Sequence, residues 1–416
     1  MTTAFLDRHS KVFGRSATLM LKIAGLTASE SEGRGAHIID SEGRDWLDFG
    51  SFGIHLLGHC NPAIVEVARA QVSRFGLSSK ILANEWAVSA GEKLCALTGG
   101  RHQGVLFANS GSEAIEITIK MCRMATGRRR FVALDGAYHG RTDGALQLSS
   151  SYVRHAGAPA AGAVDFVRPG DTERLADLLR TGAIAGVYVE PVQGEGGIRP
   201  VDTDFLWQVR ELCDAYGTLM VCDEIQTGLG RAGQLVHCPS ADIITYGKTL
   251  AGGIVPVAAV VFDTAKIGNH ARDPIASASS YAGGALAGAV AAAVVDTVSA
   301  PGFTDDVKSK GAFAMAALRR AFAGFEGIVD IRGSGLMIGL EFTSPGLVGE
   351  TILEAAERNL LVTFCLSAPT VLRLYPPAVS TQEEIADAVT RLREAVDAAW
   401  ATTTAPTGDQ LSREAV

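Results

Sequence analysis

A lysine and an aspartate, each at the end of an apolar run, are the residues in this sequence best suited to cofactor chemistry. Lys248 follows Asp242-Ile-Ile-Thr-Tyr-Gly247 and precedes a glycine pair, which places it in a tight turn, and Asp223 ends the buried-strand pattern Leu219-Met-Val-Cys222. A lysine amine can hold the aldehyde of pyridoxal phosphate as a Schiff base, and a carboxylate can keep the ring nitrogen of that cofactor protonated. Either residue alone would be an ordinary solvated lysine or turn aspartate. Together they indicate pyridoxal phosphate chemistry.

The order of strands and helices indicates where these two side chains lie. From about residue 104 the pattern is strand then helix repeatedly, which predicts a mostly parallel sheet with helices on both faces. In open α/β sheets the ligand crevice lies outside the carboxyl ends of the strands. Strand ends near residues 108, 134 and 190 are therefore expected to converge with Asp223 and Lys248. The polar and glycine residues that follow those ends are Gly111, Ser112, Tyr138, Glu190 and Glu195.

The helix after the first of these strands is expected to begin at Gly111 and Ser112. Its free backbone N–H groups, a hydroxyl and the helix dipole could all meet a phosphate, whereas a plain serine cap is the alternative. Charged residues on one helix face would leave Ile117, Met121 and Met124 to the core.

The composition excludes several classes of protein. The 416 residues, 47% hydrophobic and 20% charged, fit a globular enzyme long enough for two domains. A net charge of -8, with no basic run longer than Arg128-Arg129-Arg130, argues against a nucleic-acid partner. Residues 285–295 are too few and too alanine-rich to span a membrane, and the N-terminus does not resemble a signal peptide. The cysteines contain no Cys-x-x-Cys pair, so we expect reduced thiols, no metal site and a cytoplasmic location.

A change in composition near residues 299–302 predicts a domain boundary. We expect residues 1–55 to form the N-terminal part of a small domain, residues 56–300 the large cofactor-binding domain, and residues 301–400 the C-terminal part of the small domain. Residues 401–416 are expected to be a disordered tail. Residues 37–49 are typical of a β-hairpin, and the glycine-rich apolar loop after them carries Phe52, which we expect in a pocket or an interface.

Several motifs, in order along nearly the whole chain, resemble the class III pyridoxal phosphate-dependent aminotransferases, the group of the ornithine, 4-aminobutyrate and putrescine enzymes. The motifs are Asn109-Ser-Gly-Ser-Glu-Ala114, Tyr138-His-Gly-Arg141, Glu190-Pro-Val-Gln-Gly-Glu195, Asp223-Glu-Ile-Gln-Thr-Gly228, the turn at Lys248, and Arg373 before Pro376-Pro377. The resemblance implies an α/β protein of fold type I, with a large domain on a mostly parallel seven-stranded sheet and a smaller α+β domain.

The resemblance also implies roles for single residues around pyridoxal 5'-phosphate. Lys248 would hold the cofactor and transfer protons, and Asp223 would pair with the pyridine nitrogen. The further cofactor-binding residues would be Gln226 near the ring hydroxyl, Tyr138 stacked on the ring, Gly111 and Ser112 at the phosphate, and Glu190.

Substrate binding and assembly follow from the same resemblance. Arg373 would bind a carboxylate of glutamate or 2-oxoglutarate, and Glu195 would cover Arg373 while an amine is bound. The Phe52 loop, expected to bind substrate, looks most like that of the putrescine and diamine branch. Ser280 keeps the hydroxyl that family members offer to the cofactor phosphate of a neighbouring subunit, which implies a homodimer or higher homo-oligomer. The loop of Ser280 departs from the threonine and asparagine-proline pair more usual in the family.

We therefore expect an aminotransferase that moves an amino group between a terminal (omega) amine, such as a diamine or ornithine-like compound, and an oxo acid such as 2-oxoglutarate. An acetylornithine or ornithine-type activity and a specialised biosynthetic aminotransferase are the alternatives. A decarboxylase or aminomutase could use the same scaffold. A non-enzymatic cofactor-binding protein is disfavoured because Lys248 and Asp223 are both present.

Overall fold

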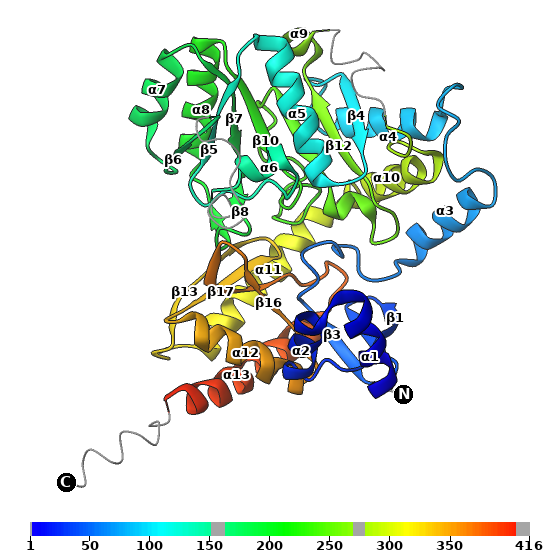
Figure 1. Cartoon of the computed structure of the whole chain (residues 1–416), viewed down its shortest axis with the longest axis vertical. Coiled ribbons are helices and arrows are strands. Elements are labelled where there is room, and N and C mark those ends of the chain that lie inside the picture. Colours follow the sequence, from blue (N-terminus) through cyan, green and yellow to red (C-terminus); the bar gives the residue numbers. More distant parts are fainter. Residues whose placement is uncertain (1, 151–162, 269–278, 405–416) are drawn as a thin grey trace.

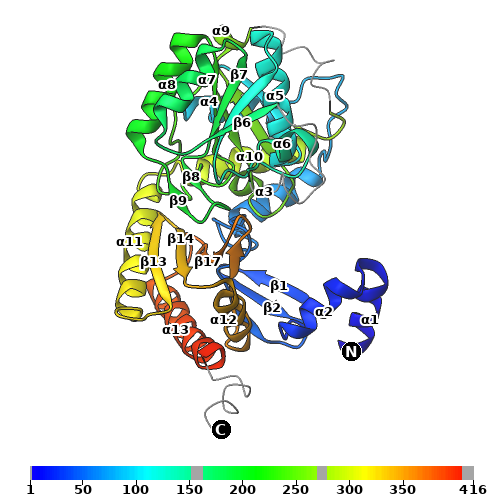
Figure 2. The same ribbon diagram turned by 60° about the vertical axis from the view of Figure 1, so that its left-hand side comes forward.

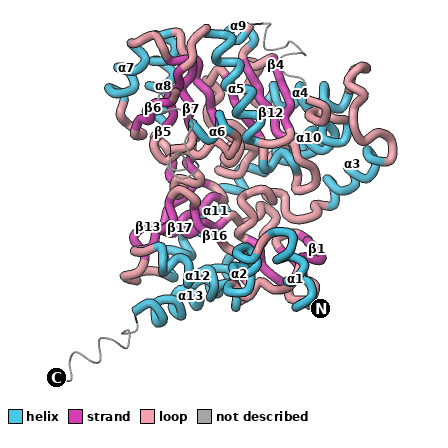
Figure 3. The backbone as a smooth tube through the Cα atoms, in the orientation of Figure 1, coloured by secondary structure: helices cyan, strands magenta, loops and turns pink. Residues whose placement is uncertain are grey.

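The chain folds into two lobes, one above the other in Figure 1. The structure is a computed structural model, which describes residues 2–150, 163–268 and 279–404. The upper lobe is built on a seven-stranded sheet and the lower lobe on two four-stranded sheets. The predicted α/β class is confirmed, with helices and strands mixed throughout (Figure 3).

The seven-stranded sheet has the order β4-β12-β11-β10-β7-β5-β6. Its strands are β4 (Gly104–Ala108), β5 (Arg130–Leu134), β6 (Val164–Val167), β7 (Ile184–Val189), β10 (Leu219–Asp223), β11 (Ile243–Tyr246) and β12 (Ala258–Phe262). The prediction of a mostly parallel sheet is confirmed, because in it β12 alone runs antiparallel to its neighbours. All residues of β7, β10 and β11 are buried, as expected for strands covered on both faces.

Helices lie on both sides of this sheet (Figures 1 and 2). The helices of the upper lobe are α3 (Pro62–Val72), α4 (Glu85–Ala96), α5 (Gly111–Thr126), α6 (Asp143–Gln147), α7 (Thr172–Arg180), α8 (Thr203–Tyr216), α9 (Thr264–Ile267) and α10 (Ala285–Val298). Of these, α3 packs against α10. The same lobe contains the 3-10 turn η1 (Lys248–Ala251) and the short strands β8 (Val192–Gln193) and β9 (Arg199–Pro200).

The predicted core face of α5 was partly wrong. Met121 is buried as expected, but Met124 is 46% exposed. The buried stripe also includes Ala114, Thr118 and Cys122. These small side chains recur every four residues, so they let the helix approach the sheet closely.

The lower lobe combines the two ends of the chain. Its strands are β1 (Glu30–Arg34), β2 (His37–Asp40), β3 (Asp45–Asp48), β13 (Ile328–Ser334), β14 (Met337–Phe342), β15 (Leu360–Leu361), β16 (Thr363–Cys365) and β17 (Ala368–Leu374). Its helices are α1 (Thr2–Phe13), α2 (Arg15–Ile23), α11 (Phe303–Ala321), α12 (Pro345–Glu357) and α13 (Gln382–Thr404). The predicted hairpin is the antiparallel pair β2–β3, and α1 and α2 project away from the lobe in Figure 2.

One buried cluster joins the two ends of the chain, since it packs Leu47 and Phe49 against Leu318, Leu340 and Leu392. The helices and strands of the upper lobe form separate clusters. On the basis of this packing, we propose domain boundaries near residues 55 and 300, as predicted from the sequence. Helix α13 ends at Thr404, so the prediction that a disordered tail begins at residue 401 was wrong for residues 401–404. Residues 405–416 of the predicted tail lie outside the described residues.

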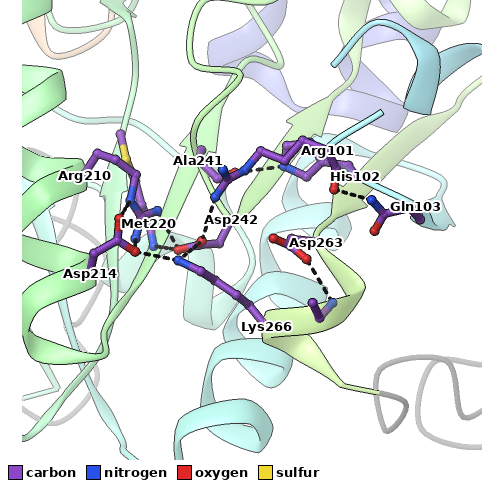
Figure 4. A network of polar contacts seen from close by, with 11 residues as sticks. Arg101, His102, Gln103, Arg210, Asp214, Met220, Ala241, Asp242, Asp263 and Lys266 are labelled. Carbon is purple, nitrogen blue, oxygen red and sulfur yellow. Dashed lines mark hydrogen bonds and ion pairs between the residues drawn. The ribbon is translucent and has the colours of Figure 1, made fainter. Parts of the chain in front are cut away.

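A network of charged side chains lies at the amino ends of the parallel strands (Figure 4). Asp242, fully buried just before β11, accepts hydrogen bonds from Arg210 Nη1 at 2.7 Å and from the Met220 backbone N–H at 2.8 Å. Its Oδ1 lies 2.9 Å from Lys266 Nζ. Arg210 also pairs with Asp214 at 2.8 Å. The network thus ties β11 to α8 and α9 at the sheet edge opposite to the carboxyl ends of the strands.

Within the described ranges, no single helix is both long and apolar enough to cross a membrane. Helices α10 and α11 together are long and apolar enough to cross a membrane, but the chain bends by 69° at the break between them. All seven cysteines are free, and five of them are buried.

Candidate active site

A cavity of about 200 Å³ lies at the carboxyl ends of β4, β5, β7, β10 and β11. The loops after these strands line it. The lining residues are Ser110, Gly111, Ser112, Tyr138, His139, Gly140, Glu190, Val192, Glu195, Asp223, Ile225, Gln226 and Lys248. The structure thus brings most of the predicted site residues together, whereas Ser280, Arg373 and Phe52 do not line the cavity.

Asp223, the last residue of β10, is held by three groups. Its Oδ2 lies 2.8 Å from His139 Nδ1, and its Oδ1 accepts from the Ile225 backbone N–H at 3.0 Å and from Thr245 Oγ1 at 3.2 Å. Burial lowers the pKa of His139, but the hydrogen bond and charge of Asp223 outweigh this and raise the pKa above its usual value. The site therefore contains a buried, hydrogen-bonded His139–Asp223 pair.

Lys248 is the first residue of η1 and has a φ angle of 38°. A lysine in the left-handed region carries backbone strain, which often marks a functional site. Removal from water lowers the pKa of Lys248 below its usual value, although the charges of Glu195 and Asp223 act in the opposite direction. A lowered pKa increases the share of neutral amine, the form that acts as a nucleophile or base.

Glu190 follows β7 and accepts a hydrogen bond from the Tyr138 backbone N–H at 3.0 Å. Burial raises the pKa of Glu190 to about 8, against the opposing charge of His139. The Glu190 carboxyl group therefore fixes the loop that carries Tyr138 and His139.

The start of α5 faces the cavity. The serine cap of this helix is Ser110, whose Oγ accepts from the Glu113 backbone N–H at 3.2 Å. A serine cap, the alternative interpretation, is therefore present, but Ser110 supplies it, and the Ser112 Oγ instead accepts from the Arg141 backbone N–H at 3.1 Å. Gly140 has a φ angle of 137°, and a Cβ there would collide with Ser112. The close approach of these two loops thus requires glycine at position 140.

The predicted substrate residues contact one another beside the cavity. Arg373 of β17 is fully buried and donates from Nη1 to Glu195 Oε1, while Glu195 Oε2 accepts from the Leu366 backbone N–H at 2.9 Å. Within the described residues, the buried Nε and Nη2 of Arg373 have no hydrogen-bond partner. The Arg373 guanidinium carbon lies 5.0 Å from the centroid of the Phe52 ring, which is 50% exposed. Burial acts to lower the pKa of Arg373, but the charge and hydrogen bond of Glu195 oppose it, and the pKa lies above its usual value.

Ser280 is exposed and does not line the cavity of its own chain. Its predicted contact with a neighbouring subunit stays a prediction. Residues 277 and 278 of the same loop lie outside the described residues.

Sequence reasoning missed six residues that the fold adds to the site. Five of them line the cavity, namely Ser110, His139, Gly140, Val192 and Ile225. The sixth, Tyr375, donates from its hydroxyl to Gln226 Oε1 at 2.9 Å. His139 adjoins the predicted Tyr138 in the sequence, which was a usable signal, but nothing local in the sequence indicates the contact of Tyr375.

The family model for class III aminotransferases matches residues 24–396. The chain belongs to the class III aminotransferases. It is therefore an enzyme of a family that uses pyridoxal 5'-phosphate.

Three similar proteins illustrate the relationship. An acetylornithine aminotransferase from Methanosarcina acetivorans is 35% identical over 373 residues, which cover 88% of this chain and 91% of that protein. A putrescine aminotransferase from Pectobacterium atrosepticum is 31% identical over 375 residues, with coverage of 86% and 80%. A solved structure of the ornithine aminotransferase from Toxoplasma gondii, which shows partial occupancy of PLP at its active site, has a TM-score of 0.84, 26% identity and coverage of 96% and 98%.

Proposed function

We propose that this aminotransferase moves an amino group from a terminal (omega) amine, such as a diamine or an ornithine-like compound, to 2-oxoglutarate. The observation that carries the proposal is that one cavity is lined by Lys248 and the Asp223–His139 pair, and that the buried Arg373–Glu195 pair lies beside them. The first two groups suit transamination, and the last pair suits the exchange of an amine for a dicarboxylate.

The residues present fit pyridoxal 5'-phosphate. The N-terminus of α5 with Ser112 offers N–H groups and a hydroxyl to a phosphate. Tyr138 and Ile225 offer flat and branched apolar surfaces that can pack on the two faces of a ring. Asp223, backed by His139, offers a carboxylate for a protonated ring nitrogen. When bound, the cofactor supplies an aldehyde for the amine and a ring that accepts electrons.

The side chains that line the cavity then have distinct roles in the reaction. Lys248 takes and returns a proton at the substrate carbon, which its lowered pKa favours. Asp223 would place a carboxylate at the ring nitrogen, and His139 keeps that carboxylate oriented. Gln226, which lines the cavity, would contact the oxygen on the ring.

Arg373 and Glu195 select between the two substrates. While the pair is closed, the guanidinium charge is covered and an amine can enter. When Glu195 moves aside, Arg373 can bind a carboxylate through two parallel hydrogen bonds. Its unpartnered Nε and Nη2 are the donors ready for such a fork.

The similarity to acetylornithine aminotransferases supports a second candidate, an acetylornithine-type activity. The similarity to the putrescine enzyme supports the first candidate, a diamine substrate. Both candidates share the same exchange with 2-oxoglutarate.

The test uses the absorption of the bound cofactor in the purified enzyme. We expect putrescine, ornithine or N-acetylornithine to abolish this absorption and 2-oxoglutarate to restore it. The amine that abolishes the absorption fastest is the preferred substrate. An unchanged spectrum with every amine would contradict the proposed function.

We further propose a homodimer or higher homo-oligomer in the cytoplasm. A patch of exposed apolar side chains supports the homo-oligomer, since the exposed fractions of Leu77, Ile81, Leu82 and Tyr281 are 55%, 90%, 78% and 65%. The segment of residues 77–82 and the loop of Tyr281 are in contact, because Lys80 Nζ donates to the Ala282 carbonyl oxygen. Patches of this kind mark association sites. Free thiols throughout the chain suit a reducing compartment. Sedimentation that shows an active monomer at assay concentration would contradict the assembly.

A further inference from the structure

Tyr375 connects the lower lobe to the cavity in the upper lobe. It follows β17, is 3% exposed, and its backbone N–H donates to the Phe49 carbonyl oxygen at 2.8 Å. Its ring lies between two buried guanidinium groups, with centroid distances of 5.5 Å to Arg373 and 5.8 Å to Arg231. The ring is thus held in place, and its hydroxyl reaches Gln226 Oε1 at 2.9 Å.

The amide of Gln226 is lodged in a space that only a glycine leaves open. A Cβ at Gly194 would collide with Gln226 Oε1, so the carboxamide oxygen lies against the backbone of that loop. Gln226 is 8% exposed and lines the cavity. Because burial raises the pKa of Tyr375, its hydroxyl stays protonated and acts as the donor to this oxygen. The NH₂ end of the amide is therefore the end left free to donate.

We propose that Tyr375 is a positioning residue that fixes the Gln226 amide with its NH₂ group toward the cavity, as a hydrogen-bond donor to an oxygen on the bound cofactor ring. The inference rests on the proposed function, because it needs the cofactor in this cavity. It adds a residue of the lower lobe to the cofactor site, through the same aromatic ring that packs on Arg373.

The consequence is a specific change in the titration of the bound cofactor. A donor aimed at a ring oxygen would stabilise the anionic form of that oxygen. It would therefore lower the pKa of the proton that the ring oxygen shares with the nitrogen through which Lys248 holds the cofactor. Without the Tyr375 hydroxyl the Gln226 amide is free to turn, and the donor is weakened. The midpoint of the absorption change should rise by about half to one pH unit in Tyr375→Phe, the amount expected for one weakened neutral hydrogen bond.

The experiment compares the pH-dependent absorption of the cofactor-loaded wild type and Tyr375→Phe. Tyr246→Phe is the matched control, since it also removes a buried tyrosine hydroxyl, but one that has no hydrogen-bond partner among the described residues and does not line the cavity. Its midpoint should equal that of the wild type. Because Phe keeps the aromatic ring beside Arg373, the KM for 2-oxoglutarate should also stay unchanged in Tyr375→Phe.

A double-mutant cycle separates this role from a general structural one. In a Gln226→Leu background, Tyr375→Phe should cause no further shift, because the amide through which it acts is absent. If Gln226→Leu moves the midpoint while Tyr375→Phe leaves it at the wild-type value, the inference is wrong. An equal shift from Tyr375→Phe with and without Gln226 would also overturn it.

A second variant covers the case in which Tyr375→Phe does not bind cofactor. Gly194→Ala would place a methyl group where Gln226 Oε1 lies, so it should displace the amide and raise the midpoint in the same direction. An unchanged midpoint in a folded, loaded Gly194→Ala protein would count against the inference. A wild type with no cofactor absorption would instead refute the proposed function itself.

Discussion

Removing Arg373 should separate the two halves of the reaction. The Arg373 guanidinium is fully buried and makes one hydrogen bond, to Glu195, while its Nε and Nη2 remain unpartnered among the described residues. Such buried donors are costly unless a ligand satisfies them. A carboxylate of 2-oxoglutarate or glutamate would satisfy them, whereas an amine would not. Arg373→Ala should therefore damage the dicarboxylate half-reaction most.

The magnitude follows from the bonds lost. A hydrogen bond to a charged group contributes about 1.5–3 kcal/mol, which corresponds to about a 10- to 150-fold rise in the apparent KM for 2-oxoglutarate. The amine half-reaction should change much less in Arg373→Ala, because the freed Glu195 carboxylate attracts a cationic amine. Arg373→Lys, which keeps the charge but lacks the planar fork, should give an intermediate loss.

Glu195→Ala should have the opposite effect. Without its carboxylate, the guanidinium of Arg373 faces the entering amine directly, so a cationic amine is repelled while dicarboxylates still bind. The amine half-reaction should slow, and the dicarboxylate half-reaction should persist. Cofactor absorbance in single-turnover experiments follows each half separately. Equal losses in both halves for both Arg373→Ala and Glu195→Ala would refute the selection between substrates.

Three further changes test other parts of the structure. Lys248→Ala should still bind cofactor but lose turnover, and residual steady-state activity above about a thousandth of the wild type would place the proton transfer elsewhere, given general acid–base contributions of roughly 10²–10⁴-fold. Asp223→Asn should bind cofactor and react slowly, because a neutral amide pairs poorly with His139 and with a protonated ring nitrogen; an unchanged single-turnover rate would rule this out. Asp242→Ala should destabilise the fold by about 3 kcal/mol or more, since it leaves the buried Arg210 poorly compensated. Asp296→Ala is its control in thermal unfolding, because the exposed pair with Lys93 should contribute about 1 kcal/mol or less.

The sequence predicted the cavity well because its residues follow strand ends in short local patterns. Glycine, a polar residue and the end of an apolar run occur together at Gly111, Tyr138, Glu190 and Lys248. Parallel strands bring their carboxyl ends to one edge whatever their order in the sheet. Residues at those ends therefore meet even when the order of the strands is unknown.

The pairing of His139 with Asp223 depends on that order. Strand β7 lies between β5 and β10 in the sheet, so the loop after β5 must pass the end of β7 before His139 can reach Asp223. Alternating apolar runs indicate that strands exist, but they do not indicate which strands are neighbours. The sequence pattern therefore could not predict the buried His139–Asp223 pair.

The substrate side of the site was harder to predict for a related reason. Arg373 and Tyr375 come from β17 and the residue after it in the lower lobe, while Glu195 and Gln226 come from loops of the upper lobe. A backbone hydrogen bond also joins the two lobes, since the Ser367 N–H donates to the Glu195 carbonyl oxygen at 3.0 Å. These contacts join residues more than a hundred positions apart, and only the packing of the two lobes creates them.

Under the proposed function, this division would give the two lobes different parts in the reaction. Lys248, Asp223 and His139 all belong to the upper lobe, so their positions relative to one another do not depend on how the lobes are placed. Carboxylate recognition does depend on it, because the guanidinium of Arg373 and the carboxylate of Glu195 approach each other across the junction. A substitution that loosens the packing of β17 should therefore act on the dicarboxylate half-reaction before it acts on the amine half-reaction. If the proposed function holds, the choice between two unlike substrates would be set by the junction of the lobes, while Lys248, Asp223 and His139 would be positioned within the upper lobe.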